Sequence, residues 1–481
     1  MAIFGKMKNN AGMYLFSNLL SRFVQNGTLR IIDSGGKVHE FKGTPEPLAT
    51  IRLHKDDLPL KLFRNPELYL GEGYMDGTIT LVDCTLSDFL GLFSINRGSL
   101  ASYPLQKVTR KITRMFRFVD QHNPIGKAHQ NVAHHYDLSR ELYELFLDRD
   151  LQYSCAYFLS PDDTLETAQA NKRRHITAKL KLEPGQKVLD IGCGWGGLAI
   201  EIAQRADVKV LGVTLSKEQL KVAAERAKTL GLDDRVRFEL LDYRHITERF
   251  DRIVSVGMFE HVGVLHYDEF FNKMFNNLTD NGFAILHSIG HMSPPNSMSA
   301  WLRKYIFPGA YGPAISEVFA ATERQHLWVS DVEVLRVHYA DTLVEWNKRF
   351  QENREKIAGI YDERFCRMWE FYLMSGETIF RTGAGMVFQM QLSRTRDAAP
   401  LSRDYMFDIE REYIEADRSA GANTAGASAK EGSGARTPEP IPKASEAPAS
   451  ASASSVTTLP AAGKKSHSTS TPAPDVEGIG K

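Results

Sequence analysis

The chain has 481 residues, which exceeds the roughly 100–150 residues of a typical domain and predicts two or three folded units. Its 59 basic and 59 acidic residues cancel, and 42% of its residues are hydrophobic, so a strongly basic nucleic-acid-binding protein and an acidic disordered scaffold are excluded. No apolar run reaches the roughly 18–20 residues of a membrane span, and the N-terminus lacks the apolar core of a signal peptide. The chain has only four cysteines, which argues against a disulfide-stapled secreted module and fits reduced thiols in the cytosol. They form no CxxC pair, so a zinc site of that type is not expected. The four are Cys84, Cys155, Cys193 and Cys366.

The first 115 residues predict a small α+β domain. Two short β runs, 29–33 and 37–41, flank Gly35-Gly36 and predict a hairpin. Residues 49–53 predict a third strand, and 86–93 a helix. A connecting segment over 116–132 leads to the next unit.

Residues 116–416 alternate strands with helices. Near-continuous apolar strand runs separated by helical patterns, such as 217–230, predict an α/β fold with a doubly wound, mainly parallel sheet. The late part of the unit predicts a helix at 362–380 and further strands at 342–346 and 386–392. The five main strands are expected at 187–191, 209–213, 235–240, 252–257 and 283–287.

From residue 417 to 481 the sequence consists mainly of Ala, Ser, Thr, Gly and Pro, and it contains no aromatic residue. Such a segment cannot bury enough apolar surface to offset the entropy of ordering it, so a disordered tail is expected.

A glycine-rich loop joins the first strand of the large unit to a helix. Its pattern is Asp190-x-Gly192-x-Gly194-x-Gly196, which differs from the dinucleotide pattern GxGxxG and has no phosphate-binding lysine after it. Glycine permits a tight turn and a close approach of the backbone to a ligand, while Asp190 can bind loop amides or a ligand's ammonium. The pattern resembles the first motif of class I S-adenosylmethionine-dependent methyltransferases, and it predicts a Rossmann-like fold with that cofactor.

The ends of the next two strands complete the expected cofactor site. Thr214 stands where such folds usually carry a ribose-binding acid, and the amide of Gln219 can meet a ribose diol. Ser216 and Gln219 also form a capping-box pattern, so capping of the helix is an equally good interpretation. Tyr243 and Arg244 are expected to flank the adenine.

Several unusual motifs in one order resemble the cyclopropane-fatty-acyl-phospholipid synthases, related to the mycolic acid cyclopropane synthases. The resemblance covers about 134–392, is weaker in the N-terminal domain and does not include the tail. It is carried by His135-Tyr136-Asp137-Leu138-Ser139, Tyr153-Ser154-Cys155-Ala156-Tyr157-Phe158, the glycine loop, Gly212 to Gln219, and Gly257-Met258-Phe259-Glu260-His261-Val262-Gly263.

The resemblance implies transfer of a methyl group from S-adenosylmethionine to a cis double bond in an acyl chain of a membrane phospholipid, followed by proton loss and closure to a cyclopropane ring. It also implies a bound bicarbonate ion that takes the proton. The implied catalytic positions are Cys155, Glu260, His287, the Ile289 main chain and Tyr339, and Tyr153 and Ser154 join the cofactor site.

Simpler interpretations stand beside these assignments. Cys155 could be a small buried hydrophobe, and His261 could serve a structural hydrogen bond. Tyr153, Tyr157, Phe158, Tyr305 and Phe307 could pack the core rather than stabilise a cation. Gly376 occupies a position where many family members carry a cysteine, which excludes a covalent role there. The spacing of His122, His129, His134 and His135 fits no standard metal site.

The substrate implies peripheral contact of a cytoplasmic protein with the membrane, and a homodimer is a further expectation. Residues 301–308 and the basic, helix-like segment 105–119 are candidate contacts. Residues 1–115 contain 15 basic and 10 acidic residues, a net +5 that suits a phospholipid surface. Three alternatives remain: a fatty-acyl methyltransferase that leaves a methyl or methylene branch, a small-molecule amine methyltransferase, and a lipid-binding module without catalysis.

Overall fold

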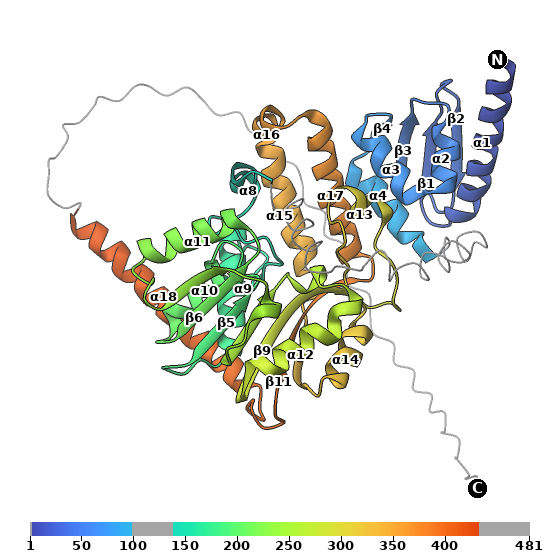
Figure 1. Cartoon of the computed structure of the whole chain (residues 1–481). Coiled ribbons are helices and arrows are strands. Elements are labelled where there is room, and N and C mark those ends of the chain that lie inside the picture. Colours follow the sequence, from blue (N-terminus) through green and yellow to red (C-terminus); the bar gives the residue numbers. More distant parts are fainter. Residues whose placement is uncertain (1, 99–137, 432–481) are drawn as a thin grey trace, which may run out of the picture. The chain divides into compact units, whose positions relative to one another are not determined.

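The computed structural model describes residues 2–98 and 138–431, and the side-chain surroundings of residues 11–98 and 138–419. Residues 1–420 form one compact unit that contains two β-sheets (Figure 1). The predicted basic helix at 105–119, the connecting segment, the domain boundary at 115 and the histidines at 122–135 lie outside the described residues.

The N-terminal sheet confirms the predicted hairpin. Strands β1 and β2 pair antiparallel and β3 pairs parallel with β1, in the order β2-β1-β3-β4. Thr85 caps α4 in a box with Asp88, at the start of the helix expected from residue 86. The long first helix was not predicted from the sequence. The elements are α1 (Ala2–Phe23), β1 (Thr28–Ile32), β2 (Val38–Lys42), β3 (Leu48–Leu53), α2 (Leu58–Arg64), α3 (Pro66–Met75), β4 (Ile79–Leu81) and α4 (Leu86–Ile95).

The second sheet has seven strands in the order β10-β11-β9-β8-β5-β6-β7. Strands β9, β8, β5, β6 and β7 run parallel, whereas β11 is antiparallel to β9 and β10 to β11. The predicted doubly wound, mainly parallel sheet is thus confirmed. The strands are β5 (Lys187–Ile191), β6 (Lys209–Thr214), β7 (Val236–Leu240), β8 (Phe250–Val256), β9 (Leu278–His291), β10 (Trp328–Val334) and β11 (Gly385–Ser393).

Helices cover both faces of this sheet (Figure 1). Successive residues of one strand serve opposite faces: Val188 of β5 packs in the cluster with α9 and α10, whereas Leu189 packs in the cluster with α12 and α14. The central strands β5 and β6 are accordingly largely apolar, as expected of strands buried on both sides, whereas β7 and β10 also carry charged and exposed residues. The helices are α8 (Arg140–Phe146), α9 (Leu165–Lys179), α10 (Gly197–Arg205), α11 (Lys217–Thr229), α12 (Tyr267–Asn277), α13 (Ala300–Tyr305), α14 (Ile315–Arg324), α15 (His338–Glu352), α16 (Arg354–Ile360) and α17 (Glu363–Arg381).

The strand predicted at 342–346 was wrong, because these residues lie inside helix α15. The buried residues Tyr339, Leu343, Trp346 and Phe350 are spaced by three or four, which is the helical period. The five-residue window Thr-Leu-Val-Glu-Trp was too short to reveal that period. The strand that completes the sheet is β10, which was not expected.

The N-terminal part contacts the larger part through α3 and α13. The indole of Trp301 is buried, donates to Met75 Sδ at 3.1 Å and lies over Gly71, where a Cβ atom would come within 2.4 Å of the ring. Lys304 Nζ donates to Glu72 at 2.6 Å. Glycine at position 71 is therefore required for the close approach of α13.

The final helix, α18 (Asp404–Glu431), extends past the boundary expected at residue 417. Asp417 accepts ion pairs from Arg174 and Arg205, at 3.0 and 2.7 Å, and so belongs to the folded unit. Residues 432–481 lie outside the described part. Within the described ranges, no helix is both long and apolar enough to cross a membrane.

Candidate active site

A cavity opens at the carboxyl ends of β5 and β6, where parallel α/β sheets place ligands. The glycine loop forms one wall, with positive φ angles of 81°, 53° and 83° at Gly192, Gly194 and Gly196. A Cβ atom on Gly194 would meet open space, whereas one on Gly196 would lie 2.8 Å from Ala223 and Phe238. The predicted cofactor residues that line the cavity are Tyr153, Ser154, Asp190, Gly192, Gly194, Thr214, Gln219, Tyr243 and Arg244. Gly196 is not among the lining residues, and it serves the packing of the loop instead.

The segment after β6 caps the next helix without the reciprocal side-chain bond of a capping box, and the ribose contact of Gln219 stays a prediction. The Ser216 hydroxyl accepts from the Gln219 N–H at 3.3 Å and caps α11. Thr214 Oγ1 donates to Gln219 Oε1 at 3.0 Å, which turns the NH₂ end of that amide away from Thr214. Gln219 therefore caps nothing with its side chain and can offer N–H donors to the cavity.

The groups expected at the adenine are held by a local ion pair. Arg244 donates to Asp242 Oδ2 at 2.6 Å, and this hydrogen bond raises the pKa of Arg244. Tyr243 packs edge-on against Phe270 at 5.4 Å between ring centroids. Tyr243 is thus fixed as one wall of the cavity.

Two buried charges face this cavity without a counter-charge close by. Asp190 Oδ2 has no hydrogen-bond partner among the described residues, and burial raises the pKa of Asp190 to about 7. Lys172 of α9 is 1% exposed and also lines the cavity. Lys172 was not predicted from the sequence, because a lysine followed by two arginines and a histidine on a helix is typical of a solvent-exposed face.

Glu260 lies in a short 3-10 turn (Phe259–His261) directly after β8. Its Oε1 accepts the Ile289 N–H at 2.6 Å, and its Oε2 is buried with no partner among the described residues. Burial raises the pKa of Glu260 to about 7, although the Ile289 amide lowers it. The N–H of Ile289, whose main chain was predicted at the catalytic site, thus binds Glu260, and the acceptor left open is Glu260 Oε2.

His287 is a neutral hydrogen-bond donor. Lys179 Nζ donates to Gln389 Oε1 at 2.7 Å, so the Gln389 amide must present its NH₂ group to His287 Nδ1, at 3.2 Å. Since an ammonium only donates, the orientation of the amide is fixed, and the single proton of a neutral His287 must sit on Nε2. Burial, with the nearby Lys172 and Lys179 ammonium groups, lowers the pKa of His287 to about 3.

The remaining predicted catalytic residues are Cys155, in the segment before α9, and Tyr339, on α15. Cys155 is 1% exposed, burial raises the pKa of its thiol, and the neighbouring Lys172 lowers it. The next residue, Ala156, donates its N–H to Thr342 Oγ1 at 3.0 Å, which fixes this segment to α15. Tyr339 is buried on the same helix, 4.7 Å from the Phe380 ring.

Aromatic rings form an enclosure beside the cavity. Tyr153 stacks on Trp346 at 5.1 Å and shares a hydrogen bond of 3.0 Å with the Tyr372 hydroxyl. Phe307 lies edge-on to Tyr372 at 5.6 Å and to His261 at 6.3 Å, and burial lowers the pKa of His261 to about 4. Tyr372 was not predicted from the sequence, since nothing local distinguishes it from a core tyrosine.

The family model for mycolic acid cyclopropane synthetase matches residues 125–390. The chain belongs to this family. It is 39% identical over 351 residues to the cyclopropane-fatty-acyl-phospholipid synthase of Escherichia coli, covering 72% of this chain and 88% of that one. It is 40% identical over 358 residues to a probable fatty acid methyltransferase of Pseudomonas putida, covering 72% and 87%. A solved structure of mycolic acid cyclopropane synthase CmaA1, complexed with SAH and CTAB, is 34% identical, with a TM-score of 0.53, and covers 57% of this chain and 99% of that one.

Membership in the synthase family makes the chain an S-adenosylmethionine-dependent methyltransferase of the cyclopropane fatty acyl synthase and fatty acid methyltransferase group. The family resemblance drawn from the motifs is confirmed. Gly376, at the departure from the family pattern, lies against Leu343, where a Cβ atom would come within 3.1 Å. Position 376 therefore carries no thiol, and it offers little room for a larger side chain.

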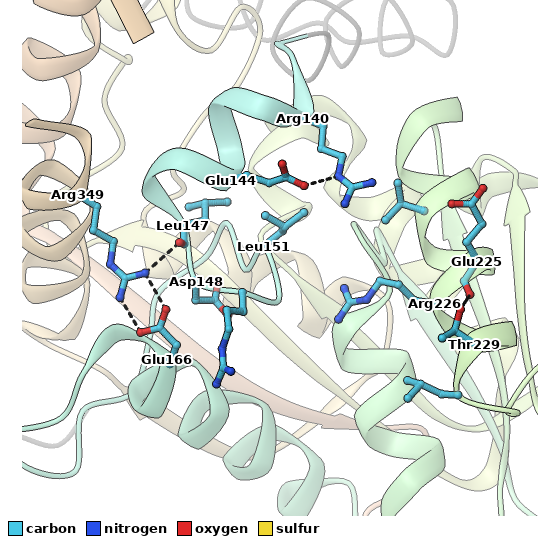
Figure 2. Close-up of a pocket in the computed structure, with 13 residues that line it drawn as sticks. Arg140, Glu144, Leu147, Asp148, Leu151, Glu166, Glu225, Arg226, Thr229 and Arg349 are labelled. Atoms are coloured by element: carbon cyan, nitrogen blue, oxygen red, sulfur yellow. Dashed lines mark hydrogen bonds and ion pairs between the residues drawn. The ribbon is translucent and has the colours of Figure 1, made fainter. Parts of the chain in front are cut away.

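A second cavity of about 760 Å³ lies next to the cofactor cavity, and Leu151 lines both (Figure 2). Several of its charged side chains are paired: Arg349 binds Glu166 and the Leu147 carbonyl, and Arg140 binds Glu144 (Figure 2). Arg226 binds Asp150 and the Trp195 carbonyl of the glycine loop. The hydrogen bond of Arg226 therefore links this second cavity to the glycine loop.

Proposed function

We propose that this protein transfers the methyl carbon of S-adenosylmethionine to the cis double bond of an acyl chain in a membrane phospholipid and closes a cyclopropane ring, with bicarbonate as the proton acceptor. Two observations carry the proposal: Glu260 has a buried carboxylate oxygen without a partner among the described residues, and His287 has a neutral N–H donor two residues before the Ile289 amide that Glu260 binds. The E. coli relative is named for this activity on phospholipids, and the CmaA1 structure contains SAH.

The polar groups fit both small molecules. Asp190 and the NH₂ of Gln219 offer an acceptor and donors to S-adenosylmethionine, and Gly194 leaves open space for it. Glu260 Oε2 can accept the O–H of bicarbonate, while His287 Nε2–H can donate to one of its other oxygens. When bound, S-adenosylmethionine supplies an electrophilic methyl group and bicarbonate supplies a base.

The aromatic enclosure fits the substrate. An alkene is a weak nucleophile, so its carbons must be aligned with the methyl group in a site without water. Electron-rich ring faces stabilise the positive charge that forms on the acyl chain, whereas water would trap it as an alcohol. Tyr153, Tyr372 and Phe307 are the rings proposed for this role, and Cys155 and Tyr339 are proposed to close the site around bicarbonate.

Vesicles provide the test. Purified full-length protein is incubated with S-adenosylmethionine, bicarbonate and phospholipid vesicles whose acyl chains carry a cis double bond, and the cleaved chains are analysed by mass spectrometry. The expected product is one CH₂ heavier and contains a ring, while vesicles with saturated chains give none. Turnover that is unchanged after rigorous removal of bicarbonate would contradict its role as base.

The second candidate function is fatty-acyl branching, which the P. putida relative's name favours. It shares the methyl transfer but ends in a methyl or methylene branch instead of a ring. Chain cleavage that locates a branch and no ring would select it.

We also propose that residues 1–115 and 116–416 act as lipid-facing and catalytic parts of a peripheral, cytoplasmic enzyme that forms a homodimer. Cosedimentation with anionic vesicles should weaken as salt rises, because exposed charges are screened. Analytical ultracentrifugation reports the oligomeric state, and a monomer under assay conditions would exclude the homodimer.

A further inference from the structure

Lys172 is a buried ammonium group with an incomplete set of partners. Its Nζ donates to Gln152 Oε1 at 2.6 Å and to Ser154 Oγ at 2.7 Å. Both acceptors are uncharged, and no carboxylate lies within 4.0 Å of Nζ among the described residues, although Asp148, Asp150 and Asp190 act on it from farther away. An ammonium has three N–H donors, so one remains for a ligand.

Burying such a charge without a counter-ion is costly, because water solvates it far better than the protein interior does. Other buried charges on α9 are compensated: Lys179 pairs with Glu333, and His175 pairs with Glu333 and Glu410. Lys172 is 1% exposed and lines the cofactor cavity, as do its two acceptors. The missing negative charge must therefore come from what occupies that cavity.

Asp190, at the same cavity, is a buried carboxyl group that lacks a positively charged partner at ion-pair distance. Its Oδ2 is buried without a hydrogen-bond partner among the described residues, and Lys172 influences it electrostatically without reaching ion-pair distance. A positive and a negative group that face one cavity, held apart, are complementary to a zwitterion. Of the cofactor's parts, only its amino acid carries both an ammonium and a carboxylate.

We propose that Lys172 binds the α-carboxylate of the cofactor's amino acid, as the positive half of a two-point site whose negative half is Asp190. This assignment rests on S-adenosylmethionine occupying the cavity, which belongs to the proposed function. Lys172 also holds Ser154 and Gln152, so it connects the carboxylate to the segment that leads to Cys155.

Bicarbonate is the other anion that could meet Lys172, since Lys172 influences both Cys155 and His287 electrostatically. The geometry favours the cofactor. The hydrogen bonds of Lys172 go to residues that line the cofactor cavity, whereas Cys155, Glu260 and His287 are not among its lining residues.

The test compares ligands with and without the carboxylate. Binding of S-adenosylhomocysteine and of decarboxylated S-adenosylmethionine is measured by calorimetry on the full-length protein and on Lys172→Met. Relative to the wild-type protein, we expect the variant to lose about tenfold or more in affinity for S-adenosylhomocysteine, with little change for the decarboxylated analogue. An equal loss for both ligands, or no loss, would overturn the assignment and leave Lys172 as a structural support for Ser154.

Two further variants keep the result interpretable. Lys179→Met removes a buried charge two turns along the same helix and should leave the ratio of the two affinities unchanged. Lys172→Arg keeps the charge and should retain much of the preference for the carboxylate. If Lys172→Met does not fold, the number of protons taken up on ligand binding tests the proposal on the wild-type protein. This number is obtained by calorimetry in buffers of different ionisation enthalpy. Proton uptake at about pH 8 is expected with S-adenosylhomocysteine and not with the decarboxylated analogue, and its absence contradicts the proposal.

The remaining outcomes separate this inference from the proposed function. An increase in the bicarbonate KM of Lys172→Met, with unchanged affinity for S-adenosylhomocysteine, would assign Lys172 to bicarbonate and reject the carboxylate site. Failure of the wild-type protein to bind either adenosyl ligand would reject the cofactor placement itself.

Discussion

The ionised carboxylate of Glu260 should destabilise the folded protein, because it is buried. Replacing it in Glu260→Gln should therefore raise the free energy of unfolding at high pH. Burial raises the pKa of Glu260 from 4.5 to about 7, so the folded protein favours the neutral acid. The penalty is therefore absent below pH 4.5, grows as the pH rises toward 7, and is complete above it. At about 1.4 kcal/mol per pKa unit, the ionised carboxylate costs the folded state about 3 kcal/mol.

The glutamine variant retains an oxygen for the Ile289 N–H but cannot ionise. Urea unfolding of both proteins at pH 5 and pH 8 should show a difference in free energy of unfolding that shifts in favour of the variant by about 2–3 kcal/mol at the higher pH. The fixed cost of burying an amide cancels in this comparison. Glu355→Gln, at an exposed position, reports how much any change of one carboxyl group to an amide alters unfolding at each pH.

Turnover supplies the second measurement. If Glu260 Oε2 accepts the O–H of bicarbonate, the variant should bind S-adenosylhomocysteine normally and lose about 100-fold or more in kcat. An unfolding difference that is the same at both pH values would refute the buried ionising carboxylate. Wild-type turnover in the variant would remove Glu260 from the base site.

Gly194→Val should abolish binding of S-adenosylhomocysteine in calorimetry, because the side chain would enter open space beside the cofactor, whereas Gly231→Val, at a similar positive φ outside the cavity, should bind normally. Nitrogen NMR of the wild-type protein should show the His287 proton on Nε2, and Gln389→Glu should move it to Nδ1 and lower kcat; an Nδ1 proton in the wild type would contradict the network. Trp301→Ala should lower the free energy of unfolding by about 3–5 kcal/mol in urea titrations, and a loss below about 1 kcal/mol would show that α13 is not anchored by its indole.

Local sequence patterns were sufficient wherever one short segment determined the outcome. The glycine loop, the parallel strands and Glu260 at the end of β8 each follow from residues adjacent in the chain. Helix α15 was misassigned at 342–346 because its apolar period appears only over about three turns, from Tyr339 to Phe350. Local patterns therefore located the strand ends that carry the site and missed elements whose signal is longer than the window.

Lys172 was missed for a different reason. Helix α9 contains four consecutive charged or titratable residues, yet each of them is buried, as is Lys179. Their partners are far away in the sequence: Glu333 is on β10, and Glu410 and Asp417 are on α18. Burial of a charged helix is a property of the assembled fold, so no window along α9 could reveal which of its charges lacks a partner.

Burial acts on all the titratable groups of the site in one direction, toward their neutral forms. It raises the pKa of Asp190 and Glu260 to about 7, and it lowers that of Lys172 to about 7 and that of His287 to about 3. A site built this way is nearly neutral before its ligands bind, and its charged forms become favourable when the complementary charges arrive. The cofactor's ammonium and carboxylate would ionise Asp190 and Lys172, whereas Glu260 has no such partner and remains near its own pKa. Glu260 is thus the group of the site best able to exchange a proton at neutral pH, as the proposed reaction with bicarbonate requires, while His287 stays a neutral donor.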